Sequence, residues 1–267
     1  MMSKLRYENK VAIITGATSG IGKGCATQFV EAGARVILSS NREAEGETVV
    51  RSLEPIVNAQ GAGDAFFVFC DVRNPRHILN LIEATLSRHG RIDCLINNAG
   101  WHPPHKPIDD FSTEEFLDLI DLNLISVFNL CKAALPHLRL TKGNIINVAS
   151  LVGTMGQRHA TTYAATKGAI VAFTKSLAID EAPAGVRVNS ISPGNIYTPL
   201  WQQAIDAAAD PEQCRRDGEA AQVMGRMGTI DEVGRLCVYI AAEASFTTGV
   251  DHVISGGAEI GYGVKES

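Results

Sequence analysis

Apolar runs of four to six residues recur along the chain, and helix-length segments separate them. Both faces of each run are apolar, which is typical of strands that helices cover on both sides. The runs comprise residues 11–15 (VAIIT), 35–38 (RVIL), 66–70 (FFVFC), 92–96 (IDCLI), 144–148 (NIINV), 186–191 (VRVNSI) and 252–255 (HVIS). Helix-start signals mark several of the intervening segments: Asn74 before Pro75, Ser112 three residues before Glu115, and Thr229 three residues before Glu232.

Strand and helix therefore alternate along the whole chain. This pattern predicts an α/β fold of one domain, residues 1–267, in which right-handed crossovers wind a seven-stranded parallel sheet on both sides. Ligands are then expected at the carboxyl ends of the strands. The least regular stretch is 192–228, from SPGNIYTPLW through DPEQCRRDGE. An irregular segment of this length is usually a lid or binding loop, so we expect substrate closure there.

Composition and charge exclude several classes of protein. A chain of 267 residues with 45% hydrophobic and 20% charged side chains has enough apolar residues for one sizeable core. The formal charge of −5 is mild and unclustered, so a nucleic-acid partner is not expected. The first ten residues lack the apolar region of a secretory signal, and the apolar runs are shorter than the roughly 20 residues of a membrane span. We expect a cytoplasmic protein with no membrane span.

The cysteines are also informative, since they lie far apart and form no CxxC pair. We therefore expect reduced thiols, most of them in the core, and no metal site. They are Cys25, Cys70, Cys94, Cys131, Cys214 and Cys237.

A glycine-rich turn follows the first strand and opens a helix. Gly16 permits the tight turn, Gly20 lets the backbone approach a pyrophosphate, and Gly22 allows close contact between helix and strand. The spacing is GxxxGxG, and a purely structural role for these glycines is the alternative. In the first βα unit of such a fold, the turn predicts a dinucleotide site formed by Gly16, Thr18, Ser19, Gly20, Ile21 and Gly22.

The second strand ends in Ser39-Ser40-Asn41-Arg42, with no carboxylate. An Asp or Glu there would bind the two ribose hydroxyls and repel a 2′-phosphate, whereas Ser40 and Arg42 could accept that phosphate. The tip therefore favours NADP without excluding NAD, although Arg42 could also be a solvated loop charge. Further cofactor contacts are expected after strands three and four: Asp71 and Val72 beside the adenine, and Asn98, Ala99 and Gly100 near the ribose and nicotinamide.

The candidate catalytic residues are Ser150, at the end of the fifth strand, with Tyr163 and Lys167 four residues apart on a helix. That spacing puts the last two on one helix face. An ammonium a few ångströms away would favour the phenolate by about 1–4 kcal/mol, and so bring Tyr163 toward a useful acid/base range. We expect Tyr163 to exchange the substrate proton, Ser150 to hold the substrate oxygen and Lys167 to grip the nicotinamide ribose. Asn123 could hold a water that links Lys167 to solvent.

In combination, these motifs resemble the short-chain dehydrogenase/reductase family over nearly the whole chain. They are TGATSGIG (15–22), NNAG (97–100), Asn123, Ser150, Tyr163-AAT-Lys167 and Pro193-Gly194. The resemblance implies a seven-stranded Rossmann sheet, NAD or NADP as hydride carrier, the tetrad Asn123, Ser150, Tyr163 and Lys167, and a homotetramer. It adds Pro193, Gly194, Ile196 and Thr198 to the cofactor contacts.

Four segments are similar to the branch of the family that contains 17β-hydroxysteroid dehydrogenases. They are NNAGWHPP (97–104), SLVGTMGQ (150–157), SPGNIYTPLW (192–201) and GGAEIGYG (256–263). This likeness implies oxidation of a secondary hydroxyl, either C17 of an estradiol-type steroid or the anomeric hydroxyl of L-fucose. Two positions depart from that branch: Ser40 replaces an aspartate that goes with NAD, and Tyr197 replaces a tryptophan. The implied substrate contacts are His102, Ser150, Gln157, Trp201 and Tyr262.

Some of these residues have simpler interpretations, and two other functions remain open. His102 could be an ordinary loop residue and Trp201 an apolar anchor for a lid helix, while His105 is expected to be exposed. Reduction of 3-ketoacyl thioesters needs a basic docking face, for which Arg215 and Arg216 are the candidates. A non-catalytic, cofactor-sensing scaffold would not need Tyr163.

Overall fold

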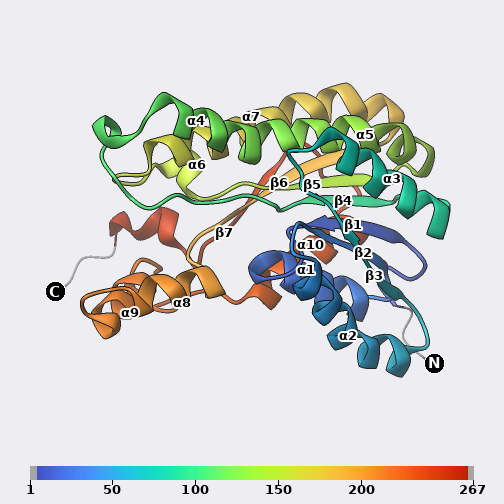
Figure 1. Ribbon diagram of the computed structural model, residues 1–267, viewed down its shortest axis with the longest axis horizontal. Coiled ribbons are helices and arrows are strands. Elements are labelled where there is room, and N and C mark those ends of the chain that lie inside the picture. The colour runs from blue at the N-terminus through green and yellow to red at the C-terminus, as the bar shows by residue number, and fades with distance from the viewer. Residues whose placement is uncertain (1–4, 264–267) are drawn as a thin grey trace.

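Seven parallel strands form one sheet at the centre of the computed structural model, which describes residues 5–263 (Figure 1). Their order across the sheet is β3-β2-β1-β4-β5-β6-β7, which reverses between β1 and β4. A reversal of this kind leaves a crevice at the carboxyl ends of the strands, where ligands bind. The fold predicted from the sequence is confirmed. The strands are β1 (Val11–Thr15), β2 (Arg35–Ser40), β3 (Asp64–Phe69), β4 (Cys94–Asn97), β5 (Asn144–Val148), β6 (Arg187–Pro193) and β7 (Asp251–Ile254).

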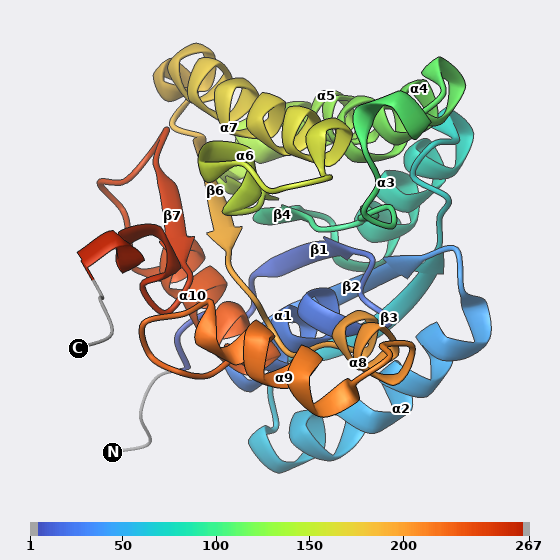
Figure 2. The same cartoon turned by 90° about the vertical axis from the view of Figure 1, so that its left-hand side faces the viewer.

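Helices cover both faces of this sheet, as Figures 1 and 2 show. One face packs against α1 (Gly20–Glu31), α2 (Glu43–Gln60) and α10 (Ile230–Ala242), and the other against α3 (Pro75–His89), α5 (Ser126–Thr141) and α7 (Thr161–Glu181). Neighbouring strand residues therefore enter different cores. Ile14 packs in the cluster that contains Phe29, whereas Ile13 packs in the cluster that contains Leu81. This explains why both faces of each strand are apolar.

The three helix-start signals act as predicted. The Asn74 side chain accepts a hydrogen bond from the backbone N–H of Arg76 at 3.0 Å and caps α3. Complete capping boxes begin two other helices. They join Ser112 with Glu115 at α4 (Thr113–Ile120), and Thr229 with Glu232 at α10.

Residues 113–141 form a single helical run, because α4 continues through the π-helical turn η2 (Asp121–Ile125) into α5. By length and mean hydropathy this run could cross a membrane, which the short apolar runs of the sequence did not indicate. Part of its apolar surface is used in the fold, although Leu117, Phe128 and Leu140 are exposed. Val127, Leu130, Ala134 and Leu138 are buried in the core on one face of the sheet. The run is therefore a core helix of this fold.

The prediction that segment 192–228 is irregular was wrong. It contains two helices, α8 (Pro199–Asp206) and α9 (Pro211–Ala220). The Thr198 and Asp210 side chains cap these helices, and a proline follows each of them. These Thr-Pro and Asp-Pro pairs are helix-start signals. The two ends of the segment meet, since the backbone N–H of Tyr197 donates to the Gly228 carbonyl at 2.8 Å. Four further short helices are η1 (Ile108–Asp110), α6 (Val152–Met155), η3 (Ala182–Ala184) and η4 (Ala258–Gly263).

Candidate active site

The turn between β1 and α1 has the shape that a dinucleotide pyrophosphate requires. A Cβ atom at Gly22 would lie 2.3 Å from the Gly16 carbonyl oxygen, so only glycine allows the helix to approach the strand this closely. No side chain caps the start of α1, since Ser19 makes no such bond, and the first turn holds no acidic residue. The free N–H groups and the positive end of the helix dipole therefore remain for an anion. The residues present fit the cofactor.

The loop after β4 is tied directly to this turn. The Thr15 hydroxyl accepts the backbone N–H groups of Asn98 and Ala99, each at 3.0 Å. In return, the Asn98 amide donates to the Thr15 carbonyl at 2.9 Å and to the Gly16 carbonyl at 3.2 Å. Sequence reasoning did not single out Thr15, although a polar residue at the end of an otherwise apolar strand was a signal. The bonds bring two predicted cofactor segments to one edge of the sheet.

The tip of β2 carries the candidate contacts to the adenosine ribose. The Ser40 hydroxyl is buried and accepts the Thr18 hydroxyl and the backbone N–H of Arg42, each at 3.2 Å. Its own hydrogen is a donor, and the Asn41 and Arg42 side chains are exposed beside it. Asp71, after β3, faces Arg73 at 3.5 Å and accepts its backbone N–H. Val72 is buried, while Pro193, Gly194, Ile196 and Thr198 follow or end β6.

Asn123 lies in η2, where it is 1% exposed, and it holds the loop after β4 in place. Its side-chain oxygen accepts the backbone N–H of Trp101 at 2.9 Å, and its amide donates to the Trp101 carbonyl at 2.9 Å. The same amide donates to the Thr166 hydroxyl on α7 at 3.2 Å. Asn123 therefore joins two functional segments, and its role in holding a water beside Lys167 stays a prediction.

Lys167 is buried on α7, and its ammonium donates to the carbonyl oxygen of Val148, at the end of β5, at 2.8 Å. Burial lowers the pKa of Lys167 to about 8, because the charged form loses its hydration. Its nitrogen lies 5.8 Å from the centre of the Tyr163 ring. The predicted shared helix face is therefore observed.

The prediction that the Lys167 ammonium lowers the pKa of Tyr163 was wrong. Burial raises the pKa of Tyr163 to about 12, and a hydrogen bond with Ser150 offsets only part of this rise. Burial disfavours the charged form of both groups, so the pair does not lower the pKa of Tyr163. Tyr163 is thus a proton donor over the neutral range, with Ser150 as its direct partner.

One histidine, His102, lies beside Tyr163, and a second, His105, lies beside His102. The His102 ring centre is 4.1 Å from that of Tyr163, and His102 Nδ1 lies 2.6 Å from the Pro103 carbonyl oxygen. The ring of His105 is 5.0 Å from that of His102, and the His105 side chain is exposed, as expected. Burial and the nearby His102 and His159 lower the pKa of His105. His102 therefore contacts the candidate acid/base, and its role in substrate binding stays a prediction.

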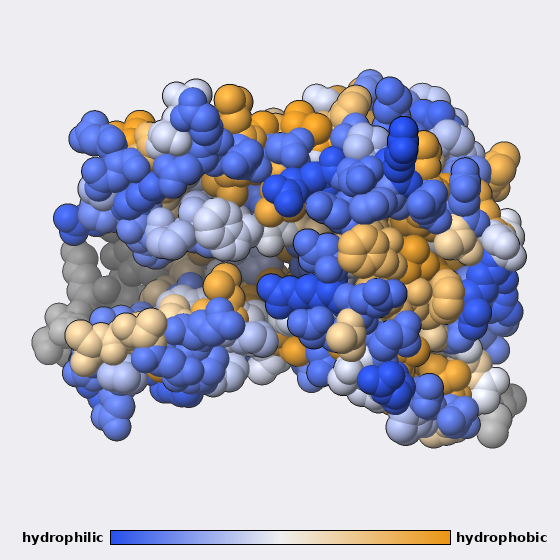
Figure 3. Space-filling view, viewed as in Figure 1, coloured by the Kyte–Doolittle hydropathy of each residue, from blue (hydrophilic) through white to orange (hydrophobic). Residues whose placement is uncertain are grey.

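The remaining predicted substrate contacts are less tightly grouped. Gln157 is exposed between α6 and α7. The indole of Trp201 lies against α9, since a Cβ atom at Gly218 would be 3.0 Å from it, which supports an anchoring role for Trp201. The side chain of Tyr262 falls outside the described residues. Figure 3 shows a hollow with largely polar rims between the layer of α6 and α7 and the lobe of α8 and α9.

All six cysteines are free, and five of them are buried, as expected. Within residues 5–263, no group of three or more His, Cys, Asp or Glu side chains is arranged to hold a metal ion.

The chain is similar to known oxidoreductases over almost all of its length. A family model described as "Enoyl-(Acyl carrier protein) reductase" matches residues 16–259. L-fucose dehydrogenase of Oryctolagus cuniculus is 47% identical over 263 residues, covering 98% of this chain and 89% of that relative. Among solved structures, L-sorbose reductase from Gluconobacter frateurii, complexed with NADPH and L-sorbose, has a TM-score of 0.88 at 27% identity and covers 96% of this chain and 98% of its own. 3-ketoacyl-(acyl-carrier-protein) reductase from Brucella melitensis, complexed with NADH, has a TM-score of 0.84 at 30% identity and covers 95% of this chain and 100% of its own.

The fold, the glycine turn and the buried Tyr163–Lys167 pair define a nicotinamide-dependent oxidoreductase. The chain belongs to the short-chain dehydrogenase/reductase family and is an NAD(P)-dependent enzyme.

Proposed function

We propose that this enzyme oxidises the anomeric hydroxyl of L-fucose, or of a closely related pyranose, to the lactone. The observation that carries the proposal is the polar group around the reacting phenol, where Ser150 bonds to Tyr163 and the His102 ring lies 4.1 Å from it. A substrate with several hydroxyls finds donors and acceptors there. The L-fucose dehydrogenase of Oryctolagus cuniculus, at 47% identity, supports the same substrate class.

The chemistry needs one acid/base and one hydroxyl donor. A bound oxidised nicotinamide would supply the hydride acceptor for this chemistry. The phenolate form of Tyr163, which is the minor form over the neutral range, takes the hydroxyl proton while the anomeric C–H bond breaks and its electron pair leaves with the hydrogen. Ser150 donates a hydrogen bond to the oxygen that becomes the lactone carbonyl. Lys167 would hold the nicotinamide ribose and so help to orient the cofactor for hydride transfer.

For the cofactor we propose a preference for NADP. Ser40 offers a hydroxyl and Arg42 a guanidinium at the tip of β2, where a carboxylate would favour NAD. In Ser40→Asp, like-charge repulsion of about 1–4 kcal/mol should weaken NADP binding by about fivefold or more and spare NAD. Ser40→Ala is the matched control, because it removes the hydroxyl without adding charge. Equal NADP affinity in Ser40→Asp and Ser40→Ala would show that this tip does not select the cofactor.

The substrate is tested by a panel assayed at 340 nm with NAD and NADP separately. L-fucose and related aldoses form one arm, estradiol a second, and an acetoacetyl thioester with reduced cofactor a third. We expect turnover with L-fucose and a lactone product identified by mass. Turnover of estradiol alone would replace this proposal with the 17β-hydroxysteroid activity. The thioester arm is disfavoured, because Arg216 bonds to Gln213 and Glu212 and Arg215 lies over Tyr197.

Several broader expectations accompany this proposal. We take the α8–α9 segment, residues 192–228, as the lid over the substrate, with Gln157, Trp201 and Tyr262 among its contacts. A cytoplasmic homotetramer with no nucleic-acid partner is the assembly that the sequence favours. Light scattering coupled to gel filtration measures the subunit number directly.

A further inference from the structure

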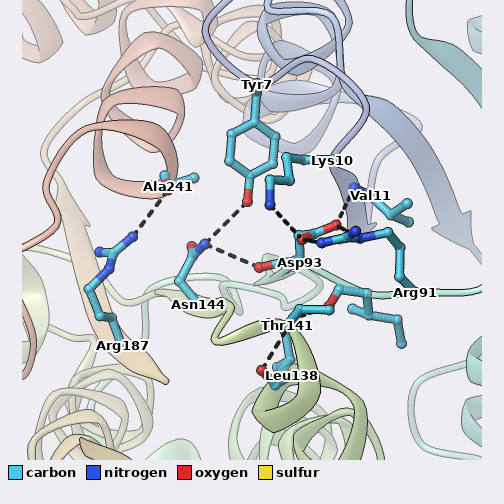
Figure 4. Close-up of polar contacts among 11 residues, drawn as sticks. Tyr7, Lys10, Val11, Arg91, Asp93, Leu138, Thr141, Asn144, Arg187 and Ala241 are labelled. Atoms are coloured by element: carbon cyan, nitrogen blue, oxygen red, sulfur yellow. Dashed lines mark hydrogen bonds and ion pairs between the residues drawn. The ribbon is translucent and has the colours of Figure 1, made fainter. Parts of the chain in front are cut away.

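A polar pocket lies at the amino-terminal edge of the sheet, opposite the edge that carries the active site (Figure 4). Parallel strands all begin at this edge, so the residues around the starts of β1, β4, β5 and β6 converge there. The cavity has a volume of about 300 Å³. None of its residues belongs to the cofactor or substrate groups described above. The residues that matter here are Arg6, Tyr7, Lys10, Asp93, Asn144 and Arg187.

The Tyr7 hydroxyl is the buried donor of this pocket. Tyr7 is 6% exposed, and its ring packs edge-on against Phe29 at 5.3 Å between centres. Its oxygen accepts the Asn144 amide at 3.2 Å, but no acceptor for its own hydrogen is found among residues 5–263. Burial raises the pKa of Tyr7, so the phenol keeps that hydrogen. A buried donor without an acceptor costs free energy that a ligand oxygen would recover.

Asp93 is the single buried carboxylate among the lining residues of the pocket, and protein donors already occupy both of its oxygens. Asp93 accepts two hydrogen bonds from Arg91, at 2.6 and 2.8 Å, and a third from the backbone N–H of Val11 at 2.9 Å. The Lys10 ammonium lies 3.3 Å from Asp93 and is about half exposed, so two of its hydrogens remain for another acceptor. Two cations, Arg91 and Lys10, thus share the single negative charge of Asp93, which leaves a net positive charge beside the cavity.

Arg187 adds to this excess of positive charge. Its guanidinium donates to two backbone carbonyls, of Ala241 at 3.1 Å and Thr247 at 3.4 Å, and to no carboxylate within the described chain. Arg6 and Lys142 also line the pocket, Arg6 as the ion-pair partner of Glu243, and Glu8 is the one further carboxylate of the lining. Cations thus outnumber carboxylates at this edge of a protein whose formal charge is −5. Such a concentration of one sign attracts ligands of the other.

We propose that this pocket binds a small oxyanion, held by the Tyr7 hydroxyl and the Lys10 ammonium. The shared ligand chemistry is that of a phosphate or carboxylate group, whose oxygens accept charge-assisted hydrogen bonds. Figure 4 shows the Tyr7 hydroxyl and the Lys10 amine directed into the same space above Asp93 and Asn144. This inference does not depend on which alcohol the enzyme oxidises, because the pocket lies on the other edge of the sheet.

The test is thermal unfolding of the enzyme saturated with reduced cofactor, so that the glycine turn is already filled. Inorganic phosphate is added in one arm and acetate in the other, each against sodium chloride at equal ionic strength. At ten times the dissociation constant, a bound anion should raise Tm by about 4 °C. Lys10→Gln and Tyr7→Phe should lose most of that rise. Lys175→Gln, an exposed lysine on α7, is the matched control and should keep it.

The arms have distinct outcomes. A rise with phosphate alone assigns the pocket to phosphate groups, and a rise with acetate as well assigns it to oxyanions in general. The proposal is overturned if neither anion exceeds chloride, or if Lys10→Gln and Tyr7→Phe respond like the wild-type enzyme. Tyr7→Phe keeps the buried ring, so a loss of response in that variant cannot be attributed to lost packing.

Discussion

Replacing the buried Lys167 by methionine tests the electrostatics of the active site through stability alone. Burial lowers the pKa of Lys167 from 10.5 to about 8, and each pKa unit corresponds to 1.36 kcal/mol. The charged lysine therefore destabilises the folded enzyme by about 3 kcal/mol below pH 8. Between pH 8 and 10.5 the unfolded chain binds more protons than the folded one, so this penalty shrinks as the pH rises.

Methionine has no charge and also loses the hydrogen bond to Val148. The loss of that bond contributes equally at every pH. The pH dependence of the difference in unfolding free energy between Lys167→Met and wild type therefore reports the charge alone. We expect the stability of Lys167→Met relative to wild type to fall by about 2 kcal/mol between pH 7 and pH 9.5. Urea unfolding of the cofactor-free enzyme at both pH values measures it. Lys175→Met, exposed on the same helix, should show no such change. A constant difference for Lys167→Met would refute the lowered pKa.

Three further predictions concern the cofactor turn, the lid and the pH profile. Gly22→Ala would place Cβ 2.3 Å from the Gly16 carbonyl oxygen, so a fluorescence titration should give at least tenfold weaker cofactor binding; unchanged binding would argue against the turn as the pyrophosphate site. Gly218→Ala would place Cβ 2.3 Å from Met227 Cε and 3.0 Å from the Trp201 indole, and the resulting shift of both side chains should raise KM for substrate several-fold and leave cofactor binding intact; an unchanged KM would show that α9 is not part of a lid. Because burial raises the pKa of Tyr163 to about 12 and oxidation needs its phenolate, kcat/KM for oxidation should increase from pH 7 to 10; a flat profile points to another base.

The sheet could be predicted because its strands obey one simple rule. A strand covered on both faces must be apolar throughout, and the run 144–148 coincides with β5 for that reason. Ends were less certain where polar residues belong to the strand, as at Asp64, which begins β3 two residues before the apolar run. The helices of the predicted lid were missed because α8 is short and α9 is polar, although Thr198 and Asp210 carried start signals.

In the candidate site, too, the local features could be predicted from the sequence and the features that depend on tertiary packing could not. Local spacing was enough to put Tyr163 and Lys167 on one helix face, and the glycine turn was visible in the sequence. The direction of the Tyr163 pKa shift was not, because desolvation depends on what the whole fold packs around the phenol. Nor did the sequence reveal the π-helical turn at Asn123, whose side chain binds the backbone of Trp101 on both sides. Such contacts join residues that are far apart in the chain.

The role of Tyr163 as the proton-exchanging group is tested most directly by single-turnover hydride transfer in Tyr163→Phe. Enzyme and oxidised cofactor are premixed at saturating concentrations and then mixed with L-fucose, and the absorbance at 340 nm is followed. Phenylalanine keeps the ring against His102 and removes only the hydroxyl, so cofactor affinity should stay within a few fold of wild type. We predict a rate at least 1,000-fold lower, on the scale of lost acid–base catalysis. A rate within tenfold of the wild-type value would contradict the assignment.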